Sequence, residues 1–252
     1  MLKRYFNLLK NIRNWQVYFK VKRNPDVFFL MKGKNKIQFW LVEEIIPIFK
    51  EIYMQDIYQI KFLRKELSTQ EPIIVDIGAN AGYAATFFFQ FFPKARILSF
   101  EPLPTNFELL SKNQQENAHL HWEIIPKAVG DCTGSTQIFY CKSKEITPVA
   151  SILQNFDAQN TDNLSVEMIS LQDIFQEYAL PHIDLLKVDC EGAEYDILYA
   201  TPKQILDKVR CIVMETHFCN KVNANQDAMK NFLQKQGFEV KTQKEMLWAW
   251  NA

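Results

Sequence analysis

The stretch that decides the fold covers residues 73–82 and reads Ile73-Ile74-Val75-Asp76-Ile77-Gly78-Ala79-Asn80-Ala81-Gly82. Its first half is an apolar, β-branched run that is interrupted only by Asp76, a pattern typical of a strand buried on both faces of a sheet. The two glycines that follow allow the backbone to turn tightly and to approach a ligand closely before a helix begins. The loop has the spacing G-x-N-x-G, which differs from the G-x-G-x-x-G of a dinucleotide-binding fold.

Buried-strand patterns of this kind recur along the chain and alternate with helical patterns. The predicted strands cover residues 73–77, 96–100, 122–129, 183–188 and 211–214. The main helices predicted between and after them cover residues 81–92, 104–117 and 223–236. Because strands that alternate with helices form parallel sheets, the sequence predicts an α/β fold with a doubly wound, mostly parallel sheet.

Two further segments predict antiparallel pairing. Residues 134–166 are strand-like but polar, which indicates a hairpin insertion with a loop. Residues 238–241 and 245–250 indicate a C-terminal antiparallel strand pair.

The N-terminal part of the chain lacks this alternation of buried strands and helices. Residues 2–21 carry apolar side chains at helical spacing with lysine and arginine between them, so we predict a basic amphipathic helix that ends at Asn24-Pro25. A β-hairpin turning at Gly33 and a long helix over residues 43–67 are predicted to follow it. These patterns divide the chain into a helical segment, a hairpin and helix lead-in, and a main domain: residues 1–24, 25–72 and 73–252.

The charge of the chain is zero overall but unevenly distributed. The 252 residues contain 29 lysines and arginines and 29 acids. Residues 1–36 hold ten of the basic residues and one acid, Asp26, a charge of +9, so the remaining residues carry −9. This balance argues against a wholly basic nucleic-acid binder, and we expect no nucleic-acid partner.

Cysteine content and hydropathy bear on localisation. The five cysteines are an odd set without a C-x-x-C pair, which favours a reducing compartment. We find no uninterrupted apolar run of about 18 residues and no clean apolar stretch for a signal peptide. We therefore expect a cytoplasmic protein, with the basic helix as a candidate for peripheral contact with the inner face of a membrane.

Polar residues at the ends of the predicted strands point to the ligand. The carboxyl ends of parallel strands meet at one edge of a sheet, where ligands bind. Glu101 ends the second strand, 25 residues after Asp76, and a carboxylate there can accept hydrogen bonds from both hydroxyls of a ribose. Asp76 would repel a pyrophosphate and would suit an ammonium group. The ligand implied is an adenosine that carries an amino acid.

Six sequence blocks in order resemble the FkbM type of S-adenosylmethionine-dependent methyltransferase. The blocks are VDIGANAG (residues 75–82), SFEPLPTNFELL (99–110), KAVGD (127–131), VASIL (149–153), IDLLKVDCEGAEYDIL (183–198) and VMETH (213–217). The resemblance implies a Rossmann-like methyltransferase domain with S-adenosylmethionine as its cofactor. One departure is Gln172, where the family usually shows an acid. If that acid braces an acceptor loop in the family, either the acceptor differs here or Asp173 substitutes for it.

The resemblance also implies roles for individual residues in cofactor binding. Asp76, Gly78 and Gly82 would hold the methionine part, and Asn80 would fix the loop or touch the carboxylate. The remaining cofactor residues implied are Glu101 at the ribose, Asn106 at the ribose or the loop, Ala128 and Val129 along the adenine with Asp131 near its edge, and Asp189.

The reaction centre implied by the resemblance lies at the end of the fourth strand. Lys187, Asp189 and Glu191 would lie beside the methyl group. The chemistry requires an aligned acceptor and the removal of one proton, for which Asp189 and His217 are both candidates. The unperturbed pKa of histidine, ~6.5, is closer to the working pH than that of a carboxylate, which favours His217 as the base.

A metal ion is the less favoured alternative. The acidic group at this end of the sheet could bind a divalent cation through oxygen ligands; its members are Asp189, Glu191, Glu194 and Glu215. We expect chemistry without a metal.

The sequence thus predicts an O-methyltransferase that acts on a hydroxyl of a sugar, a glycan or a lipid-linked saccharide. The acceptor is expected to be a small molecule or glycan, with an anionic or lipid-linked one suggested by the basic N-terminal segment. An N-methyltransferase, and a nucleoside-binding module without turnover that contacts a membrane or a partner protein, remain alternatives. The G-x-N-x-G loop argues against a nicotinamide-dependent oxidoreductase.

Overall fold

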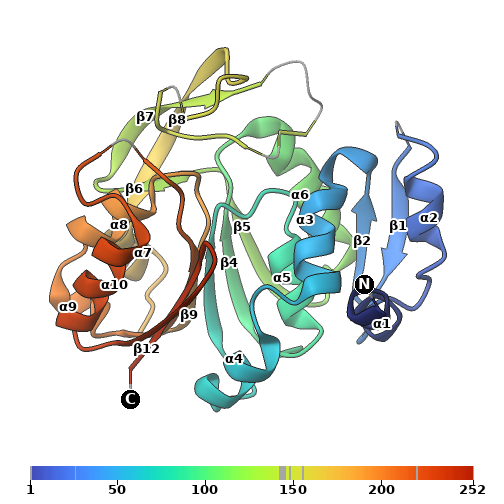
Figure 1. Ribbon diagram of the computed structural model, residues 1–252, viewed down its shortest axis with the longest axis horizontal. Helices are drawn as coiled ribbons and strands as arrows, with labels where there is room; N and C mark the ends of the chain where they lie inside the picture. Colours follow the sequence, from blue (N-terminus) through green and yellow to red (C-terminus); the bar gives the residue numbers. More distant parts are fainter. Residues whose placement is uncertain are drawn as a thin grey trace.

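The computed structural model describes residues 2–25, 27–141, 146–147, 149–154, 156–219 and 221–251. A seven-stranded sheet lies at its centre, in the order β11-β12-β10-β9-β3-β4-β5 (Figure 1). These strands are β3 (Ile73–Ile77), β4 (Arg96–Phe100), β5 (His121–Ile125), β9 (Ile183–Val188), β10 (Val209–Glu215), β11 (Glu239–Gln243) and β12 (Met246–Trp250). The first five pair in parallel and the last two are antiparallel. The predicted doubly wound fold with a C-terminal antiparallel pair is confirmed.

Helices cover both faces of the central sheet (Figure 1). On one face lie α5 (Tyr83–Phe89), α6 (Pro104–Glu116) and the N-terminal elements; on the other lie α7 (Leu171–Glu177), α8 (Glu194–Ala200), α9 (Lys203–Leu206) and α10 (Gln226–Lys235). Phe87, Phe88 and Phe89 of α5 are fully buried. Burial on both faces explains why the central strands are apolar throughout.

The predicted strand over residues 122–129 is in fact two strands. It breaks after β5 because Pro126 cannot donate a ladder hydrogen bond, and β6 (Ala128–Gly130) joins a second sheet. That sheet has the order β6-β8-β7, with β7 (Gly134–Tyr140) antiparallel to β8 (Asp162–Ser170). The predicted hairpin insertion is therefore confirmed.

Both helices predicted before residue 72 are interrupted. The first becomes α1 (Leu2–Asn11) and α2 (Val17–Val21), separated where Ile12 forms a bridge with Gly33. The second becomes η1 (Glu43–Ile45), α3 (Ile46–Phe49), the π-helical turn η2 (Lys50–Gln55) and α4 (Ile60–Leu67). Asp56 and Gln59 adopt left-handed φ values of 58° and 53° between the last two. This break turns Tyr58 towards the interior, where it is 2% exposed.

The N-terminal hairpin is fixed to the body of the molecule. It consists of β1 (Phe29–Lys32) and β2 (Gln38–Leu41). Asn113 and Asn117, one helical turn apart on α6, accept hydrogen bonds from the backbone N–H groups of Trp40 and Gln38. Side chains of this region share one hydrophobic core with α5 and the central sheet. The three-part division of the chain stays a prediction.

Among the helices of the described residues, none has the length and apolar character needed to cross a membrane.

Candidate active site

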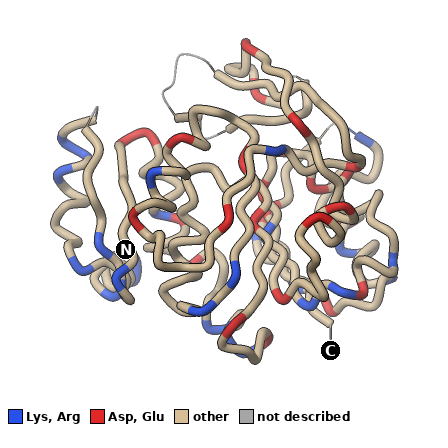
Figure 2. The backbone as a smooth tube through the Cα atoms, turned by 180° about the vertical axis from the view of Figure 1, so that it is seen from behind, with Lys and Arg blue, Asp and Glu red and all other residues tan. Residues whose placement is uncertain are grey.

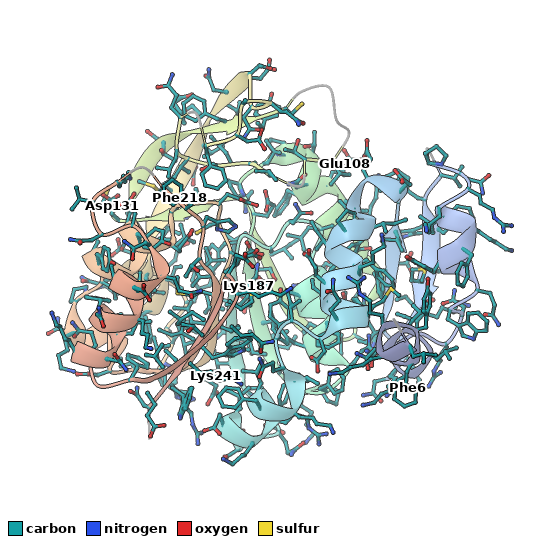
Figure 3. The ribbon with its side chains drawn as sticks, viewed as in Figure 1. Phe6, Glu108, Asp131, Lys187, Phe218 and Lys241 are labelled. Atoms are coloured by element: carbon teal, nitrogen blue, oxygen red, sulfur yellow. The ribbon has the colours of Figure 1, made fainter. Side chains whose placement is uncertain are left out.

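A cavity opens at the carboxyl edge of the parallel strands, and Lys187 marks its position near the centre of Figure 3. The space between its walls, including open solvent at the mouth, is about 1250 Å³. Ten of the twelve residues predicted for the site line it: Gly78, Asn80, Glu101, Asn106, Ala128, Val129, Lys187, Asp189, Glu191 and His217.

The other two predicted residues, Asp76 and Gly82, are not among the lining residues. Asp76 is fully buried, and its Oδ1 lies 3.1 Å from Nζ of Lys187. Gly82 has a left-handed φ of 79°, and a Cβ there would come within 2.6 Å of Leu110 and 2.8 Å of Trp122. Packing of the loop therefore requires the glycine, whereas Asp76 reaches the cavity only through Lys187.

Lys187 ties together the ends of β3 and β9. Its Nζ donates hydrogen bonds to the carbonyl oxygens of Ile77 at 3.2 Å and Gly78 at 2.7 Å, and lies 3.6 Å from Asp189 Oδ2. Burial acts to lower the pKa of Lys187, but the carboxylates of Asp76 and Asp189 outweigh burial and raise it. Burial raises the pKa of Asp76 and the lysine opposes that effect. Because the ammonium is so close, we assign the pair as ionised at neutral pH.

Glu101, at the end of β4, organises the glycine loop. Its Oε2 accepts from the N–H of Asn80 at 2.8 Å and its Oε1 from the N–H of Leu103 at 3.0 Å. Burial raises the pKa of Glu101 to about 7, against the effect of these two bonds. A Cβ at Gly78 would lie 1.8 Å from the carbonyl oxygen of Asp189, so only glycine permits the loop to approach β9 this closely.

Two asparagines hold the insertion against the cavity. Asn106 donates from Nδ2 to the carbonyl oxygen of Thr147 at 2.9 Å and accepts at Oδ1 from the N–H of Thr147 at 3.0 Å. Asn80 donates to the same carbonyl at 3.1 Å. Both predicted asparagines thus contact a loop, and Ala128 and Val129 of β6 supply an apolar part of the wall.

Carboxylates surround His217, which follows β10. Its Nδ1 lies 3.1 Å from Oε1 of Glu194, and its Nε2 lies 3.3 Å from Oε2 of Glu191 and 4.0 Å from Oδ1 of Asp189. Glu194 is fully buried and also accepts from the backbone N–H groups of His217 and Gly192, both at 2.8 Å. Glu194 therefore fixes the orientation of the imidazole.

These carboxylates decide the charge of His217. Burial acts to lower its pKa, but the hydrogen bond to Glu194 and the charges of Glu191 and Asp189 outweigh burial and raise the pKa to about 10. Burial raises the pKa of Glu191 to about 8, although His217 acts to lower it. The expectation of a pKa near that of free histidine is wrong. The imidazole keeps its proton at neutral pH and is unsuited to act as the base.

Two polar lining residues come from the N-terminal part of the chain and were missed by the sequence prediction. They are Glu51 of η2 and Tyr58 in the break before α4. Burial and the charge of Asp189 raise the pKa of Glu51. Burial and the charge of Asp189 also raise the pKa of Glu215, at the end of β10, to about 7. These acids line the cavity together with Asp189 and Glu191.

The acidic group predicted as a candidate metal site is arranged differently from the expectation. Asp189, Glu215 and His217 each offer a ligand atom within 4.8 Å of the others. Glu194 instead uses its carboxylate on Gly192 and His217. Chemistry without a metal stays a prediction.

Two further acids named in the sequence analysis are not among the lining residues: Asp131, expected at the edge of the adenine, and Asp173, a possible substitute for the family acid at position 172. Asp131 is exposed on the loop before β7. Asp173 accepts hydrogen bonds at Oδ2 from the hydroxyls of Ser170 and Thr133 at the start of α7. Asp173 therefore stabilises a helix end in this structure.

A family model described as the methyltransferase FkbM domain matches residues 76–240, well over half of the chain. The chain belongs to the FkbM methyltransferase family. It is accordingly an S-adenosylmethionine-dependent methyltransferase, as the sequence blocks predicted.

Two relatives and one solved structure are similar to this FkbM chain. The chain is 28% identical over 243 residues to methyltransferase sdnD of Sordaria araneosa, covering 85% of this chain and 90% of sdnD. It is 30% identical over 160 residues to 2-O-methyltransferase NoeI of Sinorhizobium fredii, covering 59% of this chain and 65% of NoeI. A crystal structure of methyltransferase FkbM from Methylobacillus flagellatus KT has a TM-score of 0.50 at 12% identity, covering 72% of this chain and 44% of that one. The last likeness supports the fold alone.

We expect the stability of this FkbM protein to fall as the pH rises from about 6.5 towards 10. Because the folded-state pKa of His217 is raised, its stabilising contribution is complete below the unfolded pKa of 6.5 and is lost as the pH approaches about 10. Urea denaturation at both ends of this range measures the loss. His217→Gln should remove on the order of 1–3 kcal/mol of it. His121→Gln, at an exposed histidine of β5, is the control and should leave the loss unchanged; equal losses in all three proteins would contradict the prediction.

Proposed function

We propose that this FkbM enzyme transfers the methyl group of S-adenosylmethionine to a hydroxyl of a sugar or glycan, including a lipid-linked saccharide. The observation that carries the proposal is the presence of two carboxylate positions in one cavity. Glu101 lies in the part of the lining that includes the apolar Ala128. Asp189 lies in the part that includes Glu191 and Glu215, close enough for their charges to interact. The first position suits a nucleoside, and the second suits the hydroxyl donors of an acceptor.

The lining residues fit the proposed cofactor. When bound, the cofactor supplies a methyl group on an activated sulfonium. Glu101 has carboxylate lone pairs left for ribose hydroxyls after its two backbone hydrogen bonds, and Ala128 and Val129 offer the adenine an apolar wall. The carboxylate of Asp189, 32% exposed, can attract a positive charge beside it.

The acceptor end suits a neutral polyhydroxyl compound. The oxygens of a carboxyl group can accept hydrogen bonds from hydroxyl groups in either protonation state, so Asp189, Glu191 and Glu215 can orient neighbouring hydroxyls of a sugar ring. Asp189 would accept the proton that the attacking hydroxyl loses. The relative NoeI is named a 2-O-methyltransferase, which supports a hydroxyl acceptor for this chain.

The acceptor can be identified by incubating cell extract with a methyl-labelled cofactor and analysing the products by mass spectrometry. We expect label on an oxygen of a saccharide. Label on nitrogen would overturn the O-methyltransferase proposal in favour of an N-methyltransferase. Cofactor binding without any labelled product would favour the nucleoside-binding module.

Glu101→Ala is expected to abolish S-adenosylmethionine binding in calorimetry. The substitution removes the acceptor for the ribose hydroxyls and also for the N–H groups of Asn80 and Leu103 that shape the loop. Two charge-assisted hydrogen bonds are worth about 1.5–3 kcal/mol each, so the affinity should fall at least about 100-fold.

The matched control for this prediction is Glu108→Ala on α6. Glu108 pairs only at the surface with Lys112, at 2.9 Å, and is 71% exposed, so binding should be unchanged. Circular dichroism verifies that both variants are folded. Wild-type affinity in the Glu101 variant would refute the assignment of this residue to the cofactor.

A further inference from the structure

The exposed side of α1 is unusually apolar for a helix on a protein surface. Leu2, Phe6 and Leu9, at spacings that share one helical face, are 90%, 65% and 53% exposed. We call them the outer apolar face of α1. Figure 3 places Phe6 at the edge of the molecule, well away from Lys187. Nine large hydrophobic side chains are exposed among the described residues, and five belong to α1 and α2, so this exposure is concentrated in one place.

Two asparagines of α1 point inwards, together with the buried Leu8. Asn11, 4% exposed, donates from Nδ2 to the carbonyl oxygen of Tyr53 at 2.9 Å, and Asn7 donates to that of Met54 at 3.0 Å. Both carbonyls belong to η2. These two amide anchors and Leu8, which is 1% exposed, hold the helix with Leu2, Phe6 and Leu9 outside. The helix thus presents a second apolar face to the solvent in addition to the one that packs on the core.

Aromatic and basic side chains surround the outer apolar face. Tyr5 stacks on Phe19 of α2 with ring centroids 6.4 Å apart, and Trp15 packs edge-on against Phe19 at 6.2 Å. Seven basic residues and no acid occur before Asp26: Lys3, Arg4, Lys10, Arg13, Lys20, Lys22 and Arg23. Figure 2 shows these basic positions gathered at the N-terminal end of the molecule. Helices that lie in a membrane interface typically combine leucine and phenylalanine with neighbouring aromatic and basic residues.

We propose that the outer apolar face of α1, with the basic residues around it, docks onto an anionic lipid bilayer. Phe6 and Leu9 enter the headgroup boundary, and the lysines and arginines contact anionic headgroups. Glu51 and Asp56, beneath the helix, lie close enough to Arg4 and to Lys10 for their charges to interact. They offset only part of the positive charge, so the surface remains complementary to an anionic one.

Charge also distinguishes a bilayer from a second copy of this chain as the occupant. A symmetric pair formed through this face would bring two sets of seven basic residues against each other. An anionic bilayer meets the same residues with opposite charge. The bilayer is therefore the occupant that the composition of the surface favours.

The docking helix is connected to the active site through η2. Helix α1 is anchored to η2, and Glu51 and Ile52 of η2 line the cavity. Resting on the function proposed above, this geometry favours a saccharide carried on a lipid as the acceptor, because such a substrate is presented at the same surface.

Co-sedimentation of the full chain with vesicles tests the docking surface without any cofactor. We expect binding to phosphatidylcholine vesicles that contain about one third phosphatidylglycerol, weaker binding to pure phosphatidylcholine, and a decrease with added salt. The double variant Phe6→Ser/Leu9→Ser should bind at least about tenfold more weakly. Lys3→Gln/Lys10→Gln should reduce the preference for anionic vesicles and leave binding to pure phosphatidylcholine unchanged.

The matched control is Val222→Ser, which removes an apolar side chain that is 91% exposed elsewhere and should bind as the wild type does. No vesicle binding by the wild type, or equal binding by all variants, would overturn the proposal. So would light scattering that reveals a dimer split by Phe6→Ser/Leu9→Ser without vesicle binding. Because calorimetry with S-adenosylmethionine is measured separately, failure of docking and failure of the proposed activity are distinguishable.

Discussion

Asp189→Asn is expected to lower kcat by about 10²–10⁴-fold, the usual contribution of a general base. Asp189 directly follows β9, its side chain is 32% exposed, and it lines the cavity. Asparagine keeps the size and polarity of the side chain, including a carbonyl oxygen for Lys187 at the present 3.6 Å, but cannot take the acceptor proton. Steady-state kinetics with a methyl-labelled cofactor measures kcat, and calorimetry verifies that cofactor affinity changes only a few-fold.

His217→Gln provides the comparison that identifies the base. Because the pKa of His217 is raised to about 10, its imidazole is already protonated at neutral pH, and its removal should cost less in kcat than the loss of the Asp189 carboxylate. The reverse order, with His217→Gln the more damaging variant and Asp189→Asn nearly active, would assign the base to the histidine.

The strands and the edge of the sheet that carries the site were predictable because their signals are local. An apolar run followed by Gly78 or by Glu101 marks both a buried strand and the end at which ligands collect. In a parallel sheet those strand ends lie at the same edge, independently of the conformation of the connecting loops. Seven of the ten predicted residues that line the cavity lie at or just after these strand ends. The other three were indicated by the family resemblance and lie on α6 and β6: Asn106, Ala128 and Val129.

The partner of Asp76 could not be predicted without knowing the register of the sheet. Asp76 on β3 pairs in register with Lys187 on β9, 111 residues later, and the two side chains meet between the strands. The sequence indicates that both are charged groups near strand ends, but not that each neutralises the other. Asp76 was therefore predicted to meet the ligand directly.

The surroundings of His217 were hidden for a related reason. Glu194 lies 23 residues before it and contacts it only after β10 has paired with β9. From the sequence alone, His217 can be given only the unperturbed pKa of histidine. In the folded protein its pKa is set by three neighbouring acids, Glu194, Glu191 and Asp189. The interruption at Asp56 and Gln59 was equally invisible, because neither residue breaks the helical pattern of residues 43–67. Without that interruption, Tyr58 could not be assigned to the cavity.

Lys187→Met is expected to lower the free energy of unfolding by about 3–5 kcal/mol, the cost of leaving a buried charge without its partner. Asp76 is 0% exposed and Lys187 is 3% exposed, so water cannot replace the lost ammonium. Among the described residues, no donor satisfies Asp76 Oδ1 with good hydrogen-bond geometry, and the charge of Lys187 is what compensates it. Urea denaturation measures the loss.

A double-mutant cycle separates this pairing from simple loss of packing. Asp76→Leu/Lys187→Met replaces both charges with apolar groups and should recover most of the stability lost in Lys187→Met. Lys112→Met, which breaks the exposed pair with Glu108, is the control and should cost no more than about 1 kcal/mol. If Lys187→Met costs as little as this control, or if the double variant is no more stable than Lys187→Met, then the buried pair does not hold the ends of β3 and β9 together. Recovery of stability without recovery of cofactor binding would instead separate the two roles of Lys187, because only the natural lysine also donates to the carbonyl oxygens of Ile77 and Gly78 in the glycine loop.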